Sequence, residues 1–179
     1  LIGGCFAKMR QGKHIISSAI EHPAIYKTLE FLESHGFEIS ILPVDEKGHI
    51  SLNELEKTLR EDTVMVSIMT VNNEMGAVED IHAIGELIKK KNPNCLFHTD
   101  AIQAYGKMIL HPKKDFVDLL SVSGHKLHGP KGIGFLFIDE KVKINPILFG
   151  GGQQGGLRSG TLNIPGIAGM GLAAKMVYQ

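Results

Sequence analysis

Apolar and polar residues follow two rhythms along this chain, one typical of buried strands and one typical of helices. Unbroken runs of apolar, β-branched residues predict strands, and the clearest is residues 63–69, whose pattern is typical of a strand covered on both faces. Further strands are predicted at residues 14–19, 37–43, 95–98, 116–122 and 133–138. Apolar residues at helical spacing predict helices that end near residue 10 and that cover residues 23–34, 51–60 and 81–91.

Residue signals at the helix ends agree with these ranges. Pro23 lies in a first turn, where its missing N–H costs nothing, and Gly36 follows the end of that helix. Ser51 is a typical N-cap, and Glu54 three residues later completes a capping box.

Strands and helices alternate along the whole chain, which predicts an α/β fold with a largely parallel sheet. The strand at residues 133–138 follows its predecessor too closely for a parallel crossover. We therefore expect it to be an antiparallel member of a mixed sheet.

The composition excludes several classes of protein. Lysine plus arginine equals aspartate plus glutamate among the 179 residues, and no block of like charge indicates a nucleic-acid partner. The apolar runs are too short to cross a bilayer, so we expect no membrane partner. Cys5 and Cys95 lack the CxxC spacing of zinc and disulfide frameworks, so we expect no metal site and a reducing, cytoplasmic location.

Both ends of the chain look interrupted. It begins at Leu1 rather than at methionine, and residues 172–179 form a helical pattern without a stop signal. We therefore expect a piece of a longer protein.

Unusual polar residues follow the predicted strands, where ligands bind in open α/β sheets. They are His22, Asn73, Asp100 with Gln103, and the group Ser123, His125 and Lys126. Each has an ordinary structural explanation: a helix-start residue for His22, a turn residue for Asn73, an N-cap for Asp100 and a packed loop neighbour for His125. Their occurrence after four different strands favours a shared site.

Lys126 lies in a stretch rich in glycine and proline, residues 121–134. One interpretation is a tight turn whose lysine points into water, because Gly and Pro mark turns generally. The other is a lysine held in a stiff loop, away from ordinary solvation, as the covalent anchor of a carbonyl cofactor.

Pyridoxal phosphate fits this set of residues. It forms a Schiff base with a lysine, for which Lys126 is the candidate, and its ring nitrogen needs a carboxylate partner, for which Asp100 is the candidate. Gln103 could donate to the phenolate oxygen, and His22 offers a flat ring for stacking. Ser123 and His125 could hydrogen-bond the phosphate.

The chain resembles the NifS/IscS-type cysteine desulfurases of the class V aminotransferase group. The motifs that carry the resemblance cover nearly the whole chain in the family's order: residues 18–24, 69–76, 98–103, 121–134 and 150–161. The resemblance implies the three-layer α/β/α large domain of fold type I enzymes, with a mostly parallel mixed sheet. It also implies conversion of L-cysteine to L-alanine, with the sulfur left as persulfide on an enzyme cysteine.

The resemblance also implies individual roles. Lys126 and His22 would be catalytic, with His22 stacking on the cofactor and helping to move protons. Asn73 would lie near the cofactor and the substrate carboxylate. Thr161 would reach the phosphate of a neighbouring subunit, which implies a homodimer. A sulfur-acceptor protein, as in iron–sulfur cluster assembly, would complete the partners.

The chain departs from the family pattern in several places. The family's phosphate turn would precede Leu1, and its sulfur-accepting cysteine and substrate-binding arginine would follow Gln179. Gln154 and Gly155 replace the usual glutamate and arginine. We therefore predict that residues 1–179 are the cofactor-binding large domain of a longer enzyme, inactive alone. A related class V enzyme such as a selenocysteine lyase, or a non-catalytic scaffold, remains an alternative.

Overall fold

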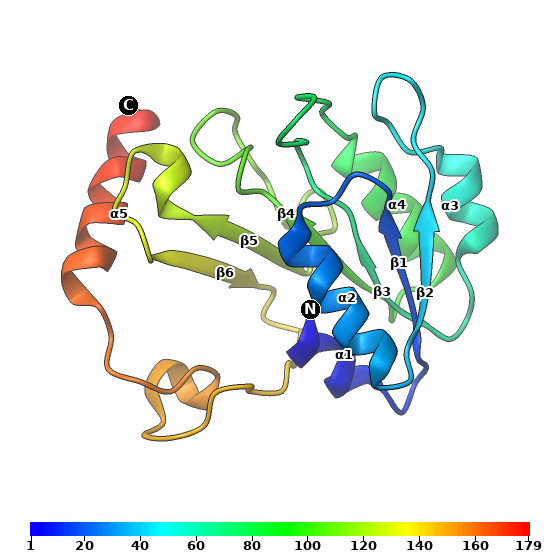
Figure 1. Ribbon diagram of the computed structural model, residues 1–179, viewed down its shortest axis with the longest axis horizontal. Helices are drawn as coiled ribbons and strands as arrows, with labels where there is room; N and C mark the ends of the chain where they lie inside the picture. The colour runs from blue at the N-terminus through cyan, green and yellow to red at the C-terminus, as the bar shows by residue number, and fades with distance from the viewer.

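A computed structural model describes the whole chain from Leu1 to Gln179, and it is built around one six-stranded sheet in the order β2-β1-β3-β4-β5-β6 (Figure 1). Five strands are parallel, and only β6 is antiparallel, paired with β5. The mixed sheet with an antiparallel final strand is therefore confirmed. The strands are β1 (His14–Ser18), β2 (Glu38–Leu42), β3 (Thr63–Ser67), β4 (Leu96–Asp100), β5 (Leu119–Ser123) and β6 (Gly134–Ile138).

The helices begin and end close to the predicted residues. They are α1 (Ile2–Lys8), α2 (Pro23–Ser34), α3 (Leu52–Thr58), α4 (Ile81–Lys91) and α5 (Ile164–Val177), with short 3-10 turns η1 (Gly124–Leu127) and η2 (Gln153–Gly156). Ser51 caps α3 by accepting from the Glu54 backbone N–H at 3.4 Å. The Glu54 side chain binds Lys57 instead of returning to Ser51, so only half of the predicted capping box forms.

The two faces of the sheet carry separate hydrophobic cores, because successive strand residues point to opposite faces. Ile15 on β1 belongs to the core beneath α1 and α2, and Ile16 belongs to the core beneath α3 and α4. Leu96 and Phe97 on β4 divide in the same way. Helices therefore cover both faces of a central sheet, which confirms the predicted three-layer arrangement.

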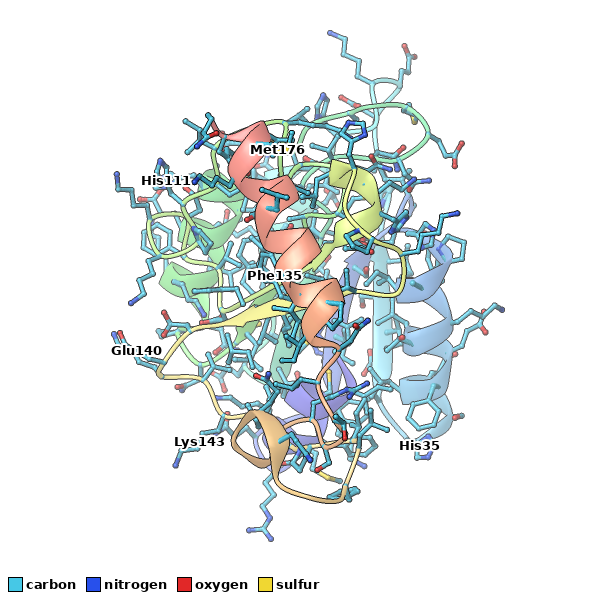
Figure 2. The ribbon with its side chains drawn as sticks, turned by 90° about the vertical axis from the view of Figure 1, so that its left-hand side faces the viewer. His35, His111, Phe135, Glu140, Lys143 and Met176 are labelled. Atoms are coloured by element: carbon cyan, nitrogen blue, oxygen red, sulfur yellow. The ribbon has the colours of Figure 1, made fainter.

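Helix α5 closes one end of the sheet (Figure 1). It lies across β6, where Phe135 is labelled beside it, and Met176 is near its last turn (Figure 2). Met170 and Ala173 of α5 join the core that contains Leu127 of η1. The side of α5 that carries Leu172 and Met176 is exposed.

Two predicted strands have different bounds in the structure. The strand predicted at residues 116–122 begins only at Leu119, because Phe116 has a positive φ of 58° that no strand residue adopts. The strand predicted at residues 95–98 continues to Asp100, so a buried strand carries the polar residues His98, Thr99 and Asp100. No helix has both the length and the apolar character that a membrane span requires.

Candidate cofactor site

Side chains that the sequence analysis selected gather along one edge of the sheet. His22 follows β1, Asn73 follows β3, Asp100 ends β4, and Lys126 lies in η1 directly after β5. Because these strands are parallel, their carboxyl ends meet at the same edge, where ligands bind in open α/β sheets. The topology therefore brings residues from four separate parts of the sequence to one edge.

Asp100 is the buried charge of this edge, with 4% of its surface exposed. Its Oδ1 accepts from the backbone N–H of Ile102 at 2.9 Å, the short-range contact of an aspartate at a turn. Burial raises the pKa of Asp100, while this hydrogen bond and the nearby His22 ring lower it. A cation beside the carboxylate would oppose the effect of burial.

His22 is the N-cap of α2, so its interpretation as a helix-start residue is confirmed. Its Nδ1 accepts from the Ala24 backbone N–H at 3.1 Å, which fixes the ring at the start of the helix. Nε2 forms no hydrogen bond within the protein, and the residue is exposed. The capping bond orients the ring and leaves one face and one nitrogen available to a ligand.

Lys126 lies in η1, which forms a tight loop. The Gly129 N–H donates to the Gly124 carbonyl at 2.9 Å, and the Gly124 N–H donates to the Ile133 carbonyl at 2.9 Å. A Cβ at Gly129 would lie 2.8 Å from the Gly124 oxygen, so this loop requires glycine there. The backbone of Lys126 is held, as predicted.

The side chain of Lys126 is exposed, however, which contradicts the expectation that the loop would keep it from solvent. The reason is that α5 packs against η1 at Leu127, the buried residue of the turn, and leaves the side of Lys126 open. Ser123 Oγ and His125 Nδ1 lie 2.7 Å apart beside it. The same short segment therefore carries one amine and two hydrogen-bonding side chains.

Asn73 and Gln103 make local contacts. Asn73 Nδ2 donates to Glu74 at 2.7 Å, and Gln103 Oε1 accepts from Lys107 Nζ at 2.9 Å. The chain after Asp100 is a turn closed by the Ala104 and Tyr105 N–H groups on the Ala101 carbonyl. The amide nitrogen of Gln103 has no partner in the protein and is free to donate to a ligand.

Thr161 is not part of this edge. It is exposed and lies in the loop between η2 and α5. That region, orange in Figure 1, lies at the end of the molecule away from η1, and Figure 2 shows the same separation. Within one chain, Thr161 does not join the other selected residues.

Three further polar residues, which the motif pattern did not single out, support the edge. Glu21 is 4% exposed and binds both Ser18 and the Met69 backbone. Asn72 Nδ2 donates to the Ile20 carbonyl at 2.7 Å. His98 is buried in β4. The sequence could have pointed to these three residues by their position, since each lies within two residues of a selected side chain.

His98 links three strands below Asp100. Its Nδ1 pairs with Ser67 Oγ at 2.8 Å, and its Nε2 pairs with Ser121 Oγ at 2.9 Å. Burial lowers the pKa of His98 well below its ordinary value. The ring is therefore a neutral crosslink of β3, β4 and β5 under the site.

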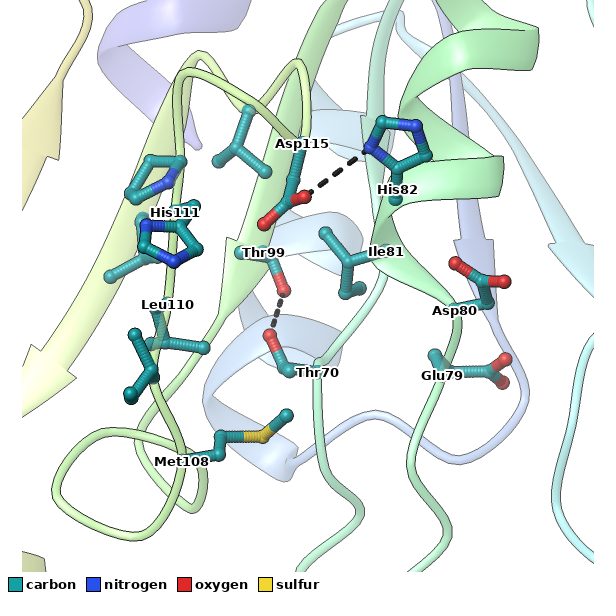
Figure 3. A pocket seen from close by; sticks show the side chains of 14 residues that line it. Thr70, Glu79, Asp80, Ile81, His82, Thr99, Met108, Leu110, His111 and Asp115 are labelled. Carbon is teal, nitrogen blue, oxygen red and sulfur yellow. Dashed lines mark hydrogen bonds and ion pairs between the residues drawn. The ribbon is translucent and has the colours of Figure 1, made fainter.

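A separate cavity of about 140 Å³ lies beside the start of α4 and contains none of the selected residues (Figure 3). Thr70 and Thr99 hydrogen-bond at 2.7 Å in its wall, and His82 lies 3.4 Å from Asp115 across it. This volume is smaller than typical small-molecule sites of about 300–1,000 Å³.

The family model that matches the chain is aminotransferase class-V, over residues 1–179. The chain therefore belongs to the aminotransferase class-V family.

Within that family, the relatives are more particular. The chain is 48% identical over 174 residues to the cysteine desulfurase IscS of Methanosarcina thermophila, an alignment that covers 97% of this chain and 43% of that protein. Among solved structures, a NifS-like protein matches with a TM-score of 0.95 and 42% identity, covering 98% of this chain and 48% of that chain. SspA in complex with cysteine matches with a TM-score of 0.91 and 39% identity, covering 97% and 50%.

These likenesses confirm the predicted fold class, the α/β/α arrangement of fold type I enzymes. The chain spans about half the length of the curated relatives that it matches.

The residues at the sheet edge fit pyridoxal phosphate. Asp100 is a buried residue whose Oδ2 accepts no hydrogen bond from the protein, so this oxygen is available to a protonated ring nitrogen. Ser123 and His125 form a hydrogen-bonded pair in the same short segment as Lys126. The chemistry of this donor set matches a ligand with a cationic ring, a carbonyl group and a phosphate.

Proposed function

We propose that this chain is the pyridoxal-phosphate-binding large domain, residues 1–179, of a cysteine desulfurase. In the whole protein, L-cysteine would be converted to L-alanine, and the sulfur would pass to an enzyme cysteine as persulfide. The relatives named cysteine desulfurase at 45–48% identity support the reaction class.

One observation carries the proposal. The buried carboxylate of Asp100 and the amine of Lys126 follow adjacent parallel strands at the same edge of the sheet. Burying a carboxylate without a cationic partner costs free energy, so the burial of Asp100 calls for a partner. An exposed lysine is stable in water and does not by itself require a carboxylate beside it. Together they match the two needs of pyridoxal phosphate, a carboxylate for its ring nitrogen and an amine for its carbonyl carbon.

Each residue has a proposed task. When bound, the cofactor supplies an electron sink for bonds broken at the substrate Cα. Lys126 would hold the cofactor and would be the group that carries a proton to or from the substrate, and Asp100 would keep the ring nitrogen protonated. His22 stacks on the ring and can move protons through its free Nε2. Gln103 donates through its free amide nitrogen.

Four residues bind the outer groups in this proposal. Ser123 and His125 hold the phosphate, and Asn73 lies by the cofactor where the substrate carboxylate enters. Thr161 reaches the phosphate of a second subunit. The loop between η2 and α5, which carries Thr161, lies away from η1 in its own chain, and this supports a role in the site of a second subunit. The proposed assembly is therefore a homodimer.

The substrate, acceptor and location are proposed on chemical grounds. A solved relative is in complex with cysteine, which supports L-cysteine as the substrate. A sulfur-acceptor protein would receive the persulfide sulfur. Cys5 and Cys95 are buried, and burial raises the pKa of each thiol to about 12, so neither is a reactive sulfur carrier. Two free thiols support a reducing compartment such as the cytoplasm.

The test is to add pyridoxal phosphate to the full-length protein and record its visible absorption. The wild type should develop the band of a lysine-bound cofactor, and Lys126→Ala should not. Lys131→Ala is the matched control, since Lys131 is an exposed lysine in the same loop. Absence of the band from the wild type would contradict the proposal and favour a non-catalytic scaffold.

Activity separates the desulfurase from related class V enzymes. The full-length protein should form L-alanine from L-cysteine, and a strong preference for L-selenocysteine would instead indicate a selenocysteine lyase. Residues 1–179 alone should bind the cofactor weakly and form no alanine. Normal alanine formation by residues 1–179 would contradict the domain assignment.

A further inference from the structure

Glu21 is a buried carboxyl group between two loops of the candidate site. It is 4% exposed and lies between the end of β1 and His22. Its Oε1 accepts from Ser18 Oγ at 2.7 Å and from the Met69 backbone N–H at 2.8 Å. Its Oε2 is buried without any partner.

These hydrogen bonds connect two loops that are distant in sequence. Glu21 joins the loop after β1 to the loop after β3, and Asn72 adds a second tie by donating to the Ile20 carbonyl at 2.7 Å. Asn72 Oδ1 also accepts from the Glu74 and Met75 N–H groups, at 2.9 and 2.8 Å. The first loop carries His22 and the second carries Asn73.

We propose that Glu21 is a positioning residue of the cofactor site: as a neutral carboxylic acid, it clamps the loop that carries His22 to the loop that carries Asn73. This inference rests on the proposed function, because it assigns Glu21 the task of holding side chains that face the cofactor. Glu21 itself acts through these neighbours.

The charges around Glu21 favour the neutral form. Burial raises the pKa of Glu21 to about 7, the bonds from Ser18 and Met69 lower it, and the like charges of Asp100 and Glu79 raise it. No lysine or arginine pairs with the carboxyl. The nearby Tyr26 hydroxyl donates to the Ser18 carbonyl, and the adjacent His22 ring is held by the Ala24 N–H. An ionised Oε2 would be a buried charge without a partner, which is costly.

A neutral Glu21 also avoids a second negative charge near Asp100, whose like charge raises the pKa of Glu21. Two ionised carboxylates within the same buried edge would repel each other. A neutral Glu21 keeps both hydrogen bonds to Oε1, since that oxygen remains an acceptor. The clamp therefore works without adding a second negative charge.

The test compares three variants of the full-length protein. Glu21→Gln keeps an acceptor for Ser18 and Met69 and cannot ionise. Glu21→Leu keeps the volume and removes the clamp. Glu79→Gln is the matched control, because Glu79 is another buried carboxyl with a raised pKa that does not bind the His22 loop.

Cofactor affinity tests the clamp. The dissociation constant for pyridoxal phosphate, measured by visible absorption, should stay within about twofold of wild type in Glu21→Gln and Glu79→Gln. It should rise about tenfold or more in Glu21→Leu, which corresponds to at least one lost hydrogen-bonded contact. Wild-type affinity in a folded Glu21→Leu would overturn the clamp, and a loss in Glu21→Gln equal to that in Glu21→Leu would also overturn it.

Melting of the cofactor-free protein tests the protonation state. A carboxyl with a raised pKa in the folded state stabilises most at low pH, and that contribution is lost as the pH rises toward about 7. The melting temperature of Glu21→Gln minus that of the wild type should therefore be larger at about pH 8.5 than at about pH 5.5. Glu33→Gln, at an exposed position that makes no ion pair, is the control and should follow wild type at both values.

An unchanged pH dependence in Glu21→Gln would overturn the neutral-acid assignment, and it would do so even if Glu21→Leu failed to fold. The two levels of proposal remain distinguishable. If the wild type binds no cofactor, the proposed function fails, while melting still decides the protonation state of Glu21. If the wild type binds cofactor and the variants behave alike, only the role of Glu21 fails.

Discussion

Asp100 and Ser121 are register partners on the adjacent parallel strands β4 and β5. Ser123 is therefore two residues further along β5, and Lys126 lies in the turn that follows. Asp100 and Lys126 are separated by 26 positions in sequence, yet Asp100 ends β4 and Lys126 follows β5, and these two strands are neighbours in the sheet at a spacing of roughly 5 Å. The pairing of β4 with β5 therefore brings Asp100 and Lys126 to the same part of the sheet edge, as their proposed roles at one cofactor require.

Asp100→Asn should weaken cofactor binding without lowering the stability of the cofactor-free protein. The amide keeps the shape but loses the charge that pairs with the ring nitrogen, so the dissociation constant should rise about 10–100-fold. Because burial raises the pKa of Asp100, its contribution to stability is greatest at low pH and is lost as the pH rises through the folded pKa. At neutral pH the variant should melt at or above the wild-type temperature, as measured by calorimetry.

A variant that binds pyridoxal phosphate as tightly as wild type would contradict the role given to Asp100. Asp80→Asn is a suitable comparison, because Asp80 is the exposed N-cap of α4 and is not part of the site edge.

His98 should make stability depend on pH in the acidic range. Its pKa is depressed in the folded state, so the neutral ring contributes stability that is present above about pH 6.5 and is lost as the pH falls below that value. In His98→Asn, the difference in free energy of unfolding between about pH 7.5 and about pH 5.5 should shrink. Urea denaturation at the two values measures it.

His98→Ala should lower the free energy of unfolding by about 2–4 kcal/mol at neutral pH, because it leaves a cavity and removes the partner of Ser67 and Ser121. His35→Ala, at an exposed histidine, is the control. Equal losses in the two variants would contradict the crosslinking role of His98.

Thr161 should act on the site of a second subunit. Thr161→Val and Lys126→Ala should each bind cofactor poorly as homodimers. If Thr161 acts between subunits, a mixed dimer of the two variants contains one site with both defects and one intact site. Subunit exchange should therefore restore binding in one of the two sites of each mixed dimer, measured by visible absorption.

No restoration after confirmed subunit exchange would place the effect of Thr161 within its own chain. A protein that stays monomeric at all concentrations in light scattering would contradict the proposed dimer itself.

Gly85 tests whether tertiary contacts override helix propensity in α4. Alanine normally stabilises a helix by about 1 kcal/mol relative to glycine. A Cβ at Gly85, however, would clash with the Asp115 carbonyl oxygen and lie 3.0 Å from Phe116 Cβ. We expect Gly85→Ala to destabilise the protein by about 1–3 kcal/mol, measured by denaturation.

Gly171→Ala in α5 is the matched control, since a Cβ there meets no atom within 4 Å. It should leave stability unchanged or raise it by up to about 1 kcal/mol. A stabilising effect at both positions would show that the close approach at Gly85 relaxes without cost.

Local patterns were sufficient to predict most of the fold. The apolar run at residues 63–69 predicted β3, and the amphipathic pattern at residues 81–91 predicted α4. Both predictions succeed because the order of apolar and polar residues reflects which side chains are buried in a strand or on one face of a helix. The short connection before β6 predicted its antiparallel direction. Phe116 was wrongly placed in a strand, since its positive φ depends on the packing of its loop.

The selection of His22, Asn73, Asp100 and Lys126 also came from the sequence, because each is a polar residue just after a buried strand. Their meeting at one edge required the strand order, which places β5 next to β4 and β3 next to β1. The exposure of Lys126 likewise depended on where α5 packs.

Glu21 shows most clearly what the sequence determined and what the tertiary structure decided. Its position beside His22 was visible in the sequence, as was its acidic chemistry. Its burial, its bond to Met69 across 48 residues and its unpartnered oxygen arise only when β1 and β3 lie side by side. Side-chain chemistry is local, whereas desolvation and hydrogen-bond partners are properties of the packed chain.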